Sequence, residues 1–186
     1  MNPVYKEKYV LSEETFGYFT IDQNKPKLDK NKRSIKIAAL VKIIGGILLI
    51  ISSLVTKQSS LLFLGGFSVF MIGFGIYDIW VKLPKYDKQI WENVKNSYKG
   101  RQYGENWFEV KFYDDHLRYL VGGNTDDLYY SDFNQFFETE HYFCIHFLTG
   151  DLIIFNPDCN REKIKDIIIS CRKKGECHPE LDGQEG

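Results

Sequence analysis

Two apolar stretches, residues 35–55 and 61–81, dominate the hydropathy pattern of the chain. As a helix, each would extend for about 30 Å, which matches the hydrocarbon core of a bilayer. We therefore expect a transmembrane hairpin over residues 35–81, in which Thr56–Ser60 connects the two helices. A signal peptide is not expected, because the polar segment 1–34 precedes the first stretch and no small-residue cleavage site follows it.

Basic residues flank the predicted hairpin at its two outer ends, whereas the connecting loop holds Lys57 alone. By the positive-inside rule, we expect a two-helix protein of the cell membrane with both termini in the cytoplasm. Residues 1–34 are then a cytoplasmic N-terminal segment. The flanking basic residues are Lys25, Lys27, Lys30, Lys32, Arg33, Lys36, Lys82, Lys85, Lys88 and Lys95.

Two charged residues inside the apolar stretches, Lys42 and Asp78, need an explanation. Lys42 would lie about 10 Å deep, and folding the hairpin about its loop places Asp78 about one helical turn nearer the cytoplasm. A lysine side chain extends in that direction to reach the interface. We predict an intramembrane ion pair between them; the alternative is two charges that reach the interface independently. Two charged groups are too few for a proton or ion relay.

Small residues recur at heptad spacing in both apolar stretches, which permits close helix packing. One row consists of Ala38, Gly45 and Ser52, with Ala39, Gly46 and Ser53 beside it; the other consists of Gly66 and Gly73, with Ser68 and Gly75 nearby.

The polar segments next to the hairpin predict short elements. Loose alternation predicts a strand at Tyr5–Leu11, a short helix capped by Ser12 follows, and the charged segment Asn24–Arg33 is expected to be a solvated linker. Within residues 82–104, apolar residues repeat every four positions and predict an amphipathic juxtamembrane helix. Its apolar face either lies on the membrane or packs on the following domain, and the mixed charges opposite favour packing.

From Trp107 onward the hydrophobic period changes to two, which predicts six short strands. Whether the N-terminal strand joins them as a seventh is left open. The predicted strands are 108–112, 116–121, 128–130, 134–138, 142–148 and 151–155, and the turns are Asp114–Asp115, Gly122–Asp126, Thr139–His141 and Thr149–Gly150.

An apolar stripe, comprising Ile164, Ile167, Ile168 and Cys171, predicts a C-terminal helix that ends at Gly175. Residues 176–186 are polar and acidic, and we expect them to be disordered. The predicted fold class is an α+β membrane protein, in which the hairpin precedes a small antiparallel β-sandwich or barrel with a C-terminal helix.

Several motifs of this region resemble the C-terminal domain of the YcxB-like family of bacterial membrane proteins: Phe112–Leu117 (FYDDHL), Tyr130–Phe133 (YSDF), Glu138–Thr139 and Ile153–Pro157 (IIFNP). The order of parts is also similar to that family. The resemblance implies a pleckstrin-homology-like fold for residues 105–175 and a membrane setting, and it implies no catalytic residue.

Residues that carry chemistry do not form a recognisable site. The cysteines contain no CxxC motif, and a reducing cytoplasm disfavours disulfides, so we expect neither a disulfide framework nor a zinc site. We expect His141 and His146 to be surface or half-buried histidines without a site. The acidic pairs Asp114–Asp115 and Asp126–Asp127 are expected in hairpin turns. We expect no metal, cofactor or enzymatic activity. The four cysteines are Cys144, Cys159, Cys171 and Cys177, the last of which adjoins His178.

Charge is distributed unevenly along the 186 residues. The net charge of −1 combines 24 basic with 25 acidic residues, but residues 97–186 contain 10 basic and 17 acidic ones. An acidic domain disfavours nucleic acid and inositol-lipid binding. We expect a tethered, non-enzymatic module whose aromatic residues help to bind a membrane-proximal protein or peptide. The alternatives are self-protection against a membrane-active peptide and a membrane-associated hydrolase, and homo-oligomerisation stays open.

Overall fold

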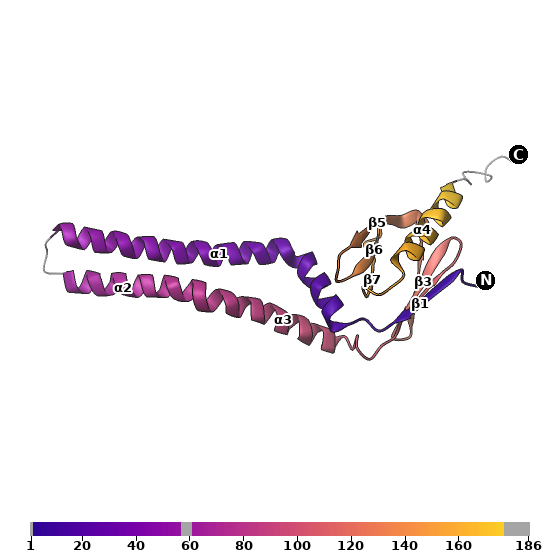
Figure 1. Cartoon of the computed structure of the whole chain (residues 1–186), viewed down its shortest axis with the longest axis horizontal. Helices are drawn as coiled ribbons and strands as arrows, with labels where there is room; N and C mark the ends of the chain where they lie inside the picture. The colour runs from indigo at the N-terminus through magenta and orange to yellow at the C-terminus, as the bar shows by residue number, and fades with distance from the viewer. Residues whose placement is uncertain (1, 57–60, 177–186) are drawn as a thin grey trace, which may run out of the picture. The chain divides into compact units, whose positions relative to one another are not determined.

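The computed structural model describes residues 2–56 and 61–176 of the chain, which is an α+β protein (Figure 1). The chain divides into two compact units, and each is described by itself. The β unit comprises Met1–Thr20 and Lys95–Gly186, and the helical unit comprises Ile21–Val94. Thr56 of the predicted connecting loop ends α1 and Glu176 of the predicted tail ends α4, whereas residues 57–60 and 177–186 lie outside the described residues.

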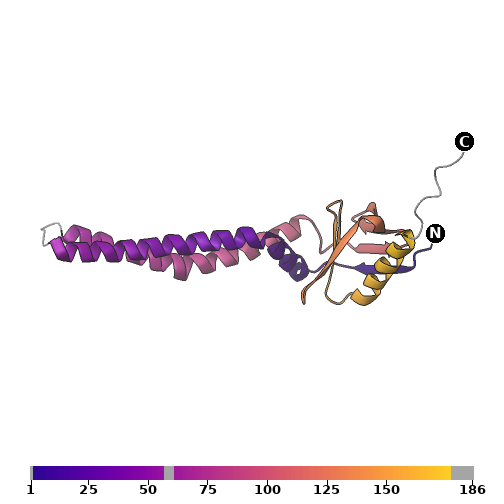
Figure 2. The same ribbon diagram turned by 90° about the horizontal axis from the view of Figure 1, so that it is seen from above.

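The helical unit is built from two long antiparallel helical stretches that lie side by side (Figures 1 and 2). The first is part of α1 (Glu13–Thr56); the second consists of α2 (Leu61–Tyr77), the π-helical turn η1 (Asp78–Lys82) and α3 (Leu83–Gly100). By length and composition, both stretches are long and apolar enough to cross a membrane.

The predicted linker Asn24–Arg33 is wrong, because these residues lie inside α1. Ser12 does cap the helix, since its Oγ accepts a 3.0 Å hydrogen bond from the N–H of Thr15, but the helix then continues to Thr56. Two polar contacts join the charged segment to α3. The side-chain amide of Asn31 donates to the hydroxyl of Tyr86 at 3.0 Å, and Lys32 forms a 2.6 Å ion pair with Asp87.

The β unit contains two antiparallel sheets and α4 (Arg161–Glu176). The first sheet has the order β1-β2-β3-β4 and the second the order β5-β6-β7. The short 3₁₀ turn η2 (Tyr130–Asp132) connects the two sheets. The strands are β1 (Tyr5–Tyr9), β2 (Phe108–Phe112), β3 (His116–Val121), β4 (Asn124–Tyr129), β5 (Phe133–Glu138), β6 (Phe143–Phe147) and β7 (Leu152–Phe155).

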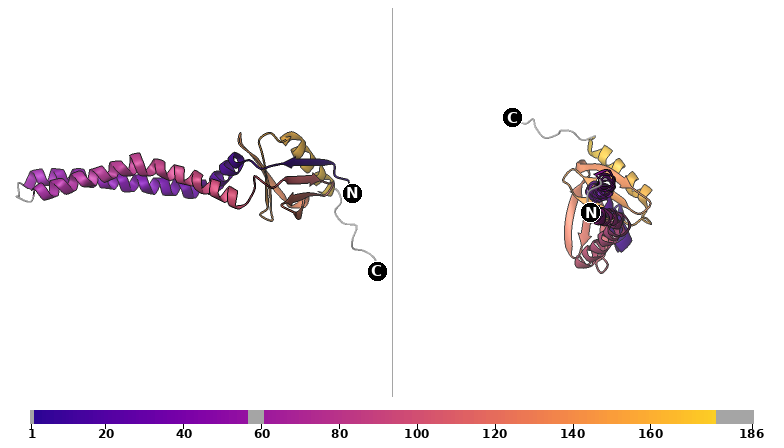
Figure 3. Two further views of the ribbon diagram at one scale, coloured as in Figure 1. Left: turned by 90° about the horizontal axis from the view of Figure 1, so that it is seen from below. Right: turned by 90° about the vertical axis from the view of Figure 1, so that its left-hand side faces the viewer.

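The N-terminal strand joins the sheet, which answers the question that the sequence leaves open. β1 pairs antiparallel with β2, with Tyr5 opposite Phe112 and Tyr9 opposite Phe108 (Figure 3). The whole helical unit is therefore inserted, in sequence, between two neighbouring strands of one sheet.

Alternating apolar residues from both sheets form one core with α4. Phe112, Phe143 and Phe155 are fully buried in this core. On α4, Ile164, Ile168 and Cys171 of the predicted stripe are buried, whereas Ile167 packs at the edge. The apolar stripe of α4 therefore faces the sheets, as its spacing predicts.

Two predicted boundaries are wrong for local reasons. The turn predicted at Gly122–Asp126 contains only Gly122 and Gly123, whose φ values of +54° and +88° suit a two-residue hairpin turn, so β4 starts at Asn124. The C-terminal helix includes Gly175 and continues to Glu176, since glycine is tolerated in a last helical turn.

The predicted juxtamembrane helix is part of α3, and its aromatic residues pack at both ends. Tyr86 lies against Asn31 of α1. Tyr98 donates a 2.5 Å hydrogen bond to the carbonyl of Leu11 and its ring contacts Phe16. The contacts of Tyr98 lie within the β unit and agree with the packing alternative, whereas Tyr86 contacts α1, which neither alternative names.

Candidate functional site

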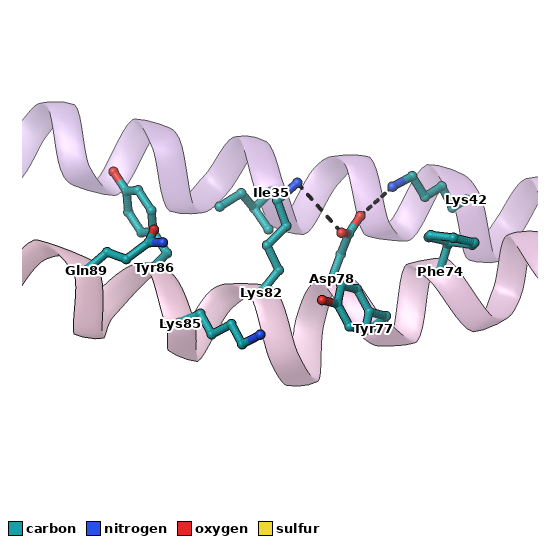
Figure 4. Close-up of a pocket in the computed structure, with 9 residues that line it drawn as sticks. All are labelled: Ile35, Lys42, Phe74, Tyr77, Asp78, Lys82, Lys85, Tyr86 and Gln89. Carbon is teal, nitrogen blue, oxygen red and sulfur yellow. Dashed lines mark hydrogen bonds and ion pairs between the residues drawn. The ribbon is translucent and has the colours of Figure 1, made fainter.

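A charged cluster lies between the two helical stretches of the helical unit. Lys42 of α1 and Asp78, the first residue of η1, form an ion pair with 2.5 Å between Nζ and Oδ2 (Figure 4). Nζ of Lys82 lies 3.8 Å from the other carboxylate oxygen, Oδ1. Asp78 is buried, with 5% of its surface exposed, so its negative charge is shared by two lysines.

Small residues next to the cluster bring the two helical stretches into contact. A Cβ added to Gly75 would lie 2.8 Å from the carbonyl oxygen of Ala39, and one added to Gly46 would lie 2.8 Å from that of Ser68. Lys42 lies between Ala39 and Gly46 on α1, so it faces Asp78, one turn beyond Gly75. Close backbone approach thus holds the two charges in register.

The helix contact is formed by Ala39 and Gly46 on α1 and by Ser68 and Gly75 on α2, and not by the heptad rows themselves. A Cβ added to Gly45, Gly66 or Gly73 would meet nothing within 4 Å. The heptad row through Gly45 therefore does not form the contact, and its neighbours Ala39 and Gly46 do. A one-residue difference rotates the helix face by about 100°, and spacing alone does not choose between adjacent faces.

A hollow of about 560 Å³ opens beside the ion pair (Figure 4). Within the described residues, three polar groups at this hollow have no hydrogen-bond or ion-pair partner: the ammonium of Lys85, the hydroxyl of Tyr77 and the amide of Gln89. Three lysines and one aspartate give the cluster a net charge of about +2 at neutral pH. The lining residues are Ile35, Lys42, Phe74, Tyr77, Asp78, Lys82, Lys85, Tyr86 and Gln89.

The polar groups that line the hollow are mostly hydrogen-bond donors. Lys42, Lys82 and Lys85 supply ammonium groups, and the lining includes no histidine or cysteine. Cationic donors around an open volume match the oxygens of a phosphate or carboxylate.

A second polar cluster lies on the β unit, and the sequence analysis missed it. Arg118 of β3 donates to both carboxylate oxygens of Asp127 on β4, at 2.6 and 2.8 Å. His116 contacts Asp115 at 2.7 Å, while its other ring nitrogen, Nε2, is buried without a hydrogen-bond partner in the described part of the chain. The pKa of the Asp127 carboxyl is lowered by Arg118, and that of Asp115 by His116.

This cluster corrects the assignment of the acidic pairs. Asp114 and Asp115 do lie in the turn between β2 and β3. Asp126 and Asp127 lie in β4 rather than in a turn, because the two glycines before them complete the turn. Arg118 lies opposite Asp127 in the register of β3 and β4. Had the predicted strand begun at Asn124, the sequence would have placed these two charges opposite each other.

The described cysteines and the other described histidines do not belong to either charged cluster. Burial raises the pKa of the Cys144 thiol to about 12 and that of Cys159 to about 11. His141 stacks on Tyr18, and His146 contacts the amide of Asn134 at 3.1 Å, so both have partners that the sequence did not show. Cys177 and His178 lie outside the described residues.

No group of three metal-ligating side chains occurs in residues 2–56 and 61–176. The site residues predicted from sequence, Lys42 and Asp78, are in contact, whereas the contribution of Lys82 and Lys85 was missed. The spacing of Lys82, four residues after Asp78, was an available signal.

Comparisons with protein-family models, with curated proteins and with solved structures find no match to the chain.

Proposed function

We propose that the chain is a two-pass membrane protein that holds a pleckstrin-homology-like domain of the YcxB type at the cytoplasmic face, where this domain binds a protein or peptide partner. The observation that carries the proposal is the pairing of β1 with β2. One strand precedes the helical unit in sequence and the other follows it. Strands can pair only on one side of a bilayer, so a hairpin that crosses twice is the arrangement consistent with this sheet.

The surface of the helical unit supports insertion in a membrane. Along α1, large aliphatic side chains such as Val41, Ile44 and Leu48 are more than half exposed. An exposed apolar surface of this extent is unusual for a water-soluble protein and typical of contact with lipid. The basic residues at the outer ends of the hairpin orient both termini toward the cytoplasm.

The architecture of the β unit supports a pleckstrin-homology-like domain. A four-stranded and a three-stranded antiparallel sheet share one core with a C-terminal helix. The order of an N-terminal piece, a helical hairpin and this domain also agrees with the motif resemblance to the YcxB-like family.

The open edge of β4 is the surface that best fits a partner. In the order β1-β2-β3-β4, β4 is an edge strand, and most of its residues are exposed. Because Val121 and Asn124 close the two-residue hairpin, alternation directs the N–H and C=O groups of Thr125, Asp127 and Tyr129 away from β3. Such an edge can pair with an extended segment of another chain.

Charge indicates which segment this edge prefers. Five aspartates lie on β4 or in the turns next to it, and Arg118 is the basic residue of the adjoining strand. We therefore expect an extended basic segment of a membrane-proximal protein, and tethering raises its effective concentration. The five are Asp114, Asp115, Asp126, Asp127 and Asp132.

Photo-crosslinking in cells tests this proposal. A photoreactive amino acid at Thr125 should capture a protein partner, whereas one at Leu148, which is also exposed, should not. The substitution Thr125→Pro removes an outward N–H but no bond to β3, so it should abolish capture by a second probe at Tyr129 while the domain stays folded. Equal capture from Leu148, or capture that survives Thr125→Pro, would exclude the β4 edge.

Topology needs a separate measurement. Alkaline phosphatase inserted at residues 57–60 should be active, because this loop would be exported, and green fluorescent protein fused to either terminus should fluoresce. An inactive phosphatase at the loop would contradict the two-pass arrangement.

A further inference from the structure

We propose that the hollow beside Asp78 binds the phosphate of an anionic lipid headgroup, with Lys82 and Lys85 as its charged ligands. This inference rests on the proposed membrane insertion. It assigns a ligand to Lys82 and Lys85, which line the hollow but do not belong to the ion pair between Lys42 and Asp78.

The charge balance of the cluster is the first argument. Lys42 already neutralises Asp78 at 2.5 Å. Lys82 reaches the same carboxylate only at 3.8 Å, and more than half of its side chain is exposed. Its ammonium has three donors, of which one at most is directed at Asp78. Lys82 and Lys85 therefore carry positive charge at the hollow that Asp78 does not neutralise.

The free donors around the hollow are the second argument. Lys85, Tyr77 and Gln89 line it and have no partner in the described residues. In Figure 4, Lys85 extends along the helix from below Lys82 toward the side on which Tyr77 lies. Ammonium, hydroxyl and amide groups can all donate to phosphate oxygens, and charge-assisted bonds of this kind are the strong ones.

An apolar hollow next to the charged one favours a lipid. This second hollow, of about 360 Å³, is lined by Phe70, Gly73, Phe74 and Tyr77. Phe74 and Tyr77 line both hollows. A lipid has a charged headgroup joined to an apolar acyl chain. The charged hollow and the adjoining apolar hollow therefore match a lipid better than they match a free ion.

The depth of the hollow agrees with this ligand. From Leu61 to Trp80, the helical rise is about 28 Å, close to the thickness of the hydrocarbon core. Trp80 is 78% exposed and Tyr77 is about half exposed, as is typical of aromatic residues at the interface. Lys82 and Lys85 then lie at the level of the phosphates of the cytoplasmic leaflet.

Calorimetric titration of the purified full-length chain in a neutral detergent tests the site. The probes are dioctanoyl phosphatidylglycerol, dioctanoyl phosphatidylcholine and inorganic phosphate. The double variant Lys82→Gln and Lys85→Gln should bind phosphatidylglycerol about 30-fold more weakly, because each lysine near an anionic lipid contributes about 1 kcal/mol. The matched control is Lys88→Gln, which removes an exposed charge of α3 that does not line the hollow.

We expect the control to change affinity less than about two-fold and phosphatidylcholine to bind weakly. An equal loss in Lys88→Gln, or equal affinity for phosphatidylcholine, would overturn the site, since the attraction would then be non-specific. Inorganic phosphate that binds as tightly as the lipid would overturn the lipid assignment. Alkaline carbonate extraction of cell membranes reports insertion separately, so a failure of the proposed function is distinguishable from a failure of this site.

Discussion

The hydroxyl of Tyr9 donates a 2.6 Å hydrogen bond to the main-chain carbonyl of Ile154, 145 residues later in the chain. Tyr9 lies on β1 and Ile154 on β7, so the bond joins an edge strand of each sheet. The ring of Tyr9 stacks on Phe108 and contacts Phe155. Burial raises the pKa of Tyr9, so its hydroxyl stays protonated and able to donate. The strand before the hairpin is thus a structural part of the β unit.

Tyr9→Phe should lower the free energy of unfolding of the β unit by about 1 kcal/mol, because the carbonyl of Ile154 loses its donor in a buried setting. Chemical denaturation of the full chain, followed by tryptophan fluorescence, measures the change. Tyr129→Phe is the control, since Tyr129 is about half exposed. A chain without residues 1–11 that kept the protease resistance of the domain would contradict this role of β1.

Gly75→Ala and Gly46→Ala should each destabilise the helical hairpin by about 1 to 3 kcal/mol, because the new methyl group meets the backbone of the facing helix. Gly45→Ala and Gly73→Ala introduce the same methyl group into open space. These controls should be neutral or stabilising by up to about 1 kcal/mol, owing to the better helix propensity of alanine. Thermal unfolding in detergent compares the two pairs, and equal losses in both would exclude the close approach.

Lys42→Leu and Asp78→Leu should each lower the thermal stability of the hairpin, because the first leaves Asp78 with Lys82 alone at 3.8 Å and the second leaves Lys42 without its partner. The double variant should recover part of the loss, with a coupling energy of about 1 to 3 kcal/mol. Lys36→Leu is a suitable control, since Lys36 has no ion pair within the described residues. Additive effects of the two substitutions would support independent charges instead of a pair.

The cysteine thiols of the β unit should react slowly in the native protein. Burial raises the pKa of Cys144 to about 12, so its thiolate fraction near neutral pH is roughly 1,000-fold below that of an ordinary thiol. In a Cys177→Ser background, iodoacetamide labelling read by mass spectrometry should be slow at Cys144 and Cys171 until denaturant is added. Thr125→Cys, on the exposed β4, provides the fast reference. Rapid native labelling of Cys144 would show that the core opens readily.

The elements that depend on local periodicity could be predicted from the sequence. Apolar length gave the apolar parts of the two long helices, alternation gave the strands from Phe108 to Phe155 except the first part of β4, and the stripe on α4 gave its buried face. The pairing of Lys42 with Asp78 followed from the geometry of a folded hairpin, because folding about the loop places Asp78 about one turn from Lys42, within reach of a lysine side chain.

The features that depend on distant contacts could not be predicted. The partner of β1 lies about 100 residues away, and no local pattern specifies such pairing. The segment Asn24–Arg33 is helical and contacts Tyr86 and Asp87 of α3, which lie more than 50 residues later in the chain. Which glycines form the helix contact depends on the rotation of each helix, and that rotation is set by packing.

Glu138 connects β5 to α4 through two cations. Its carboxylate accepts from Lys165 at 2.7 Å and from Arg161 at 3.0 Å. Lys165 and then Arg161 lower the pKa of the carboxyl below its ordinary value of 4.5. A carboxyl whose pKa is lower in the folded than in the unfolded state stabilises the fold above the unfolded pKa, and this contribution disappears as the pH falls through the folded pKa.

Glu138→Gln should therefore lower the melting temperature of the β unit slightly at pH 7, and the difference from the unmodified chain should shrink as the pH falls below about 4.5. The effect is small because the side chain of Glu138 is 41% exposed and water screens the pair. Melting curves between pH 3 and pH 7 measure it. Glu105→Gln is the matched control, since Glu105 is exposed and forms no ion pair within residues 2–56 and 61–176. If the two variants differ from the unmodified chain equally at every pH, Glu138 does not couple β5 to α4 through its charge.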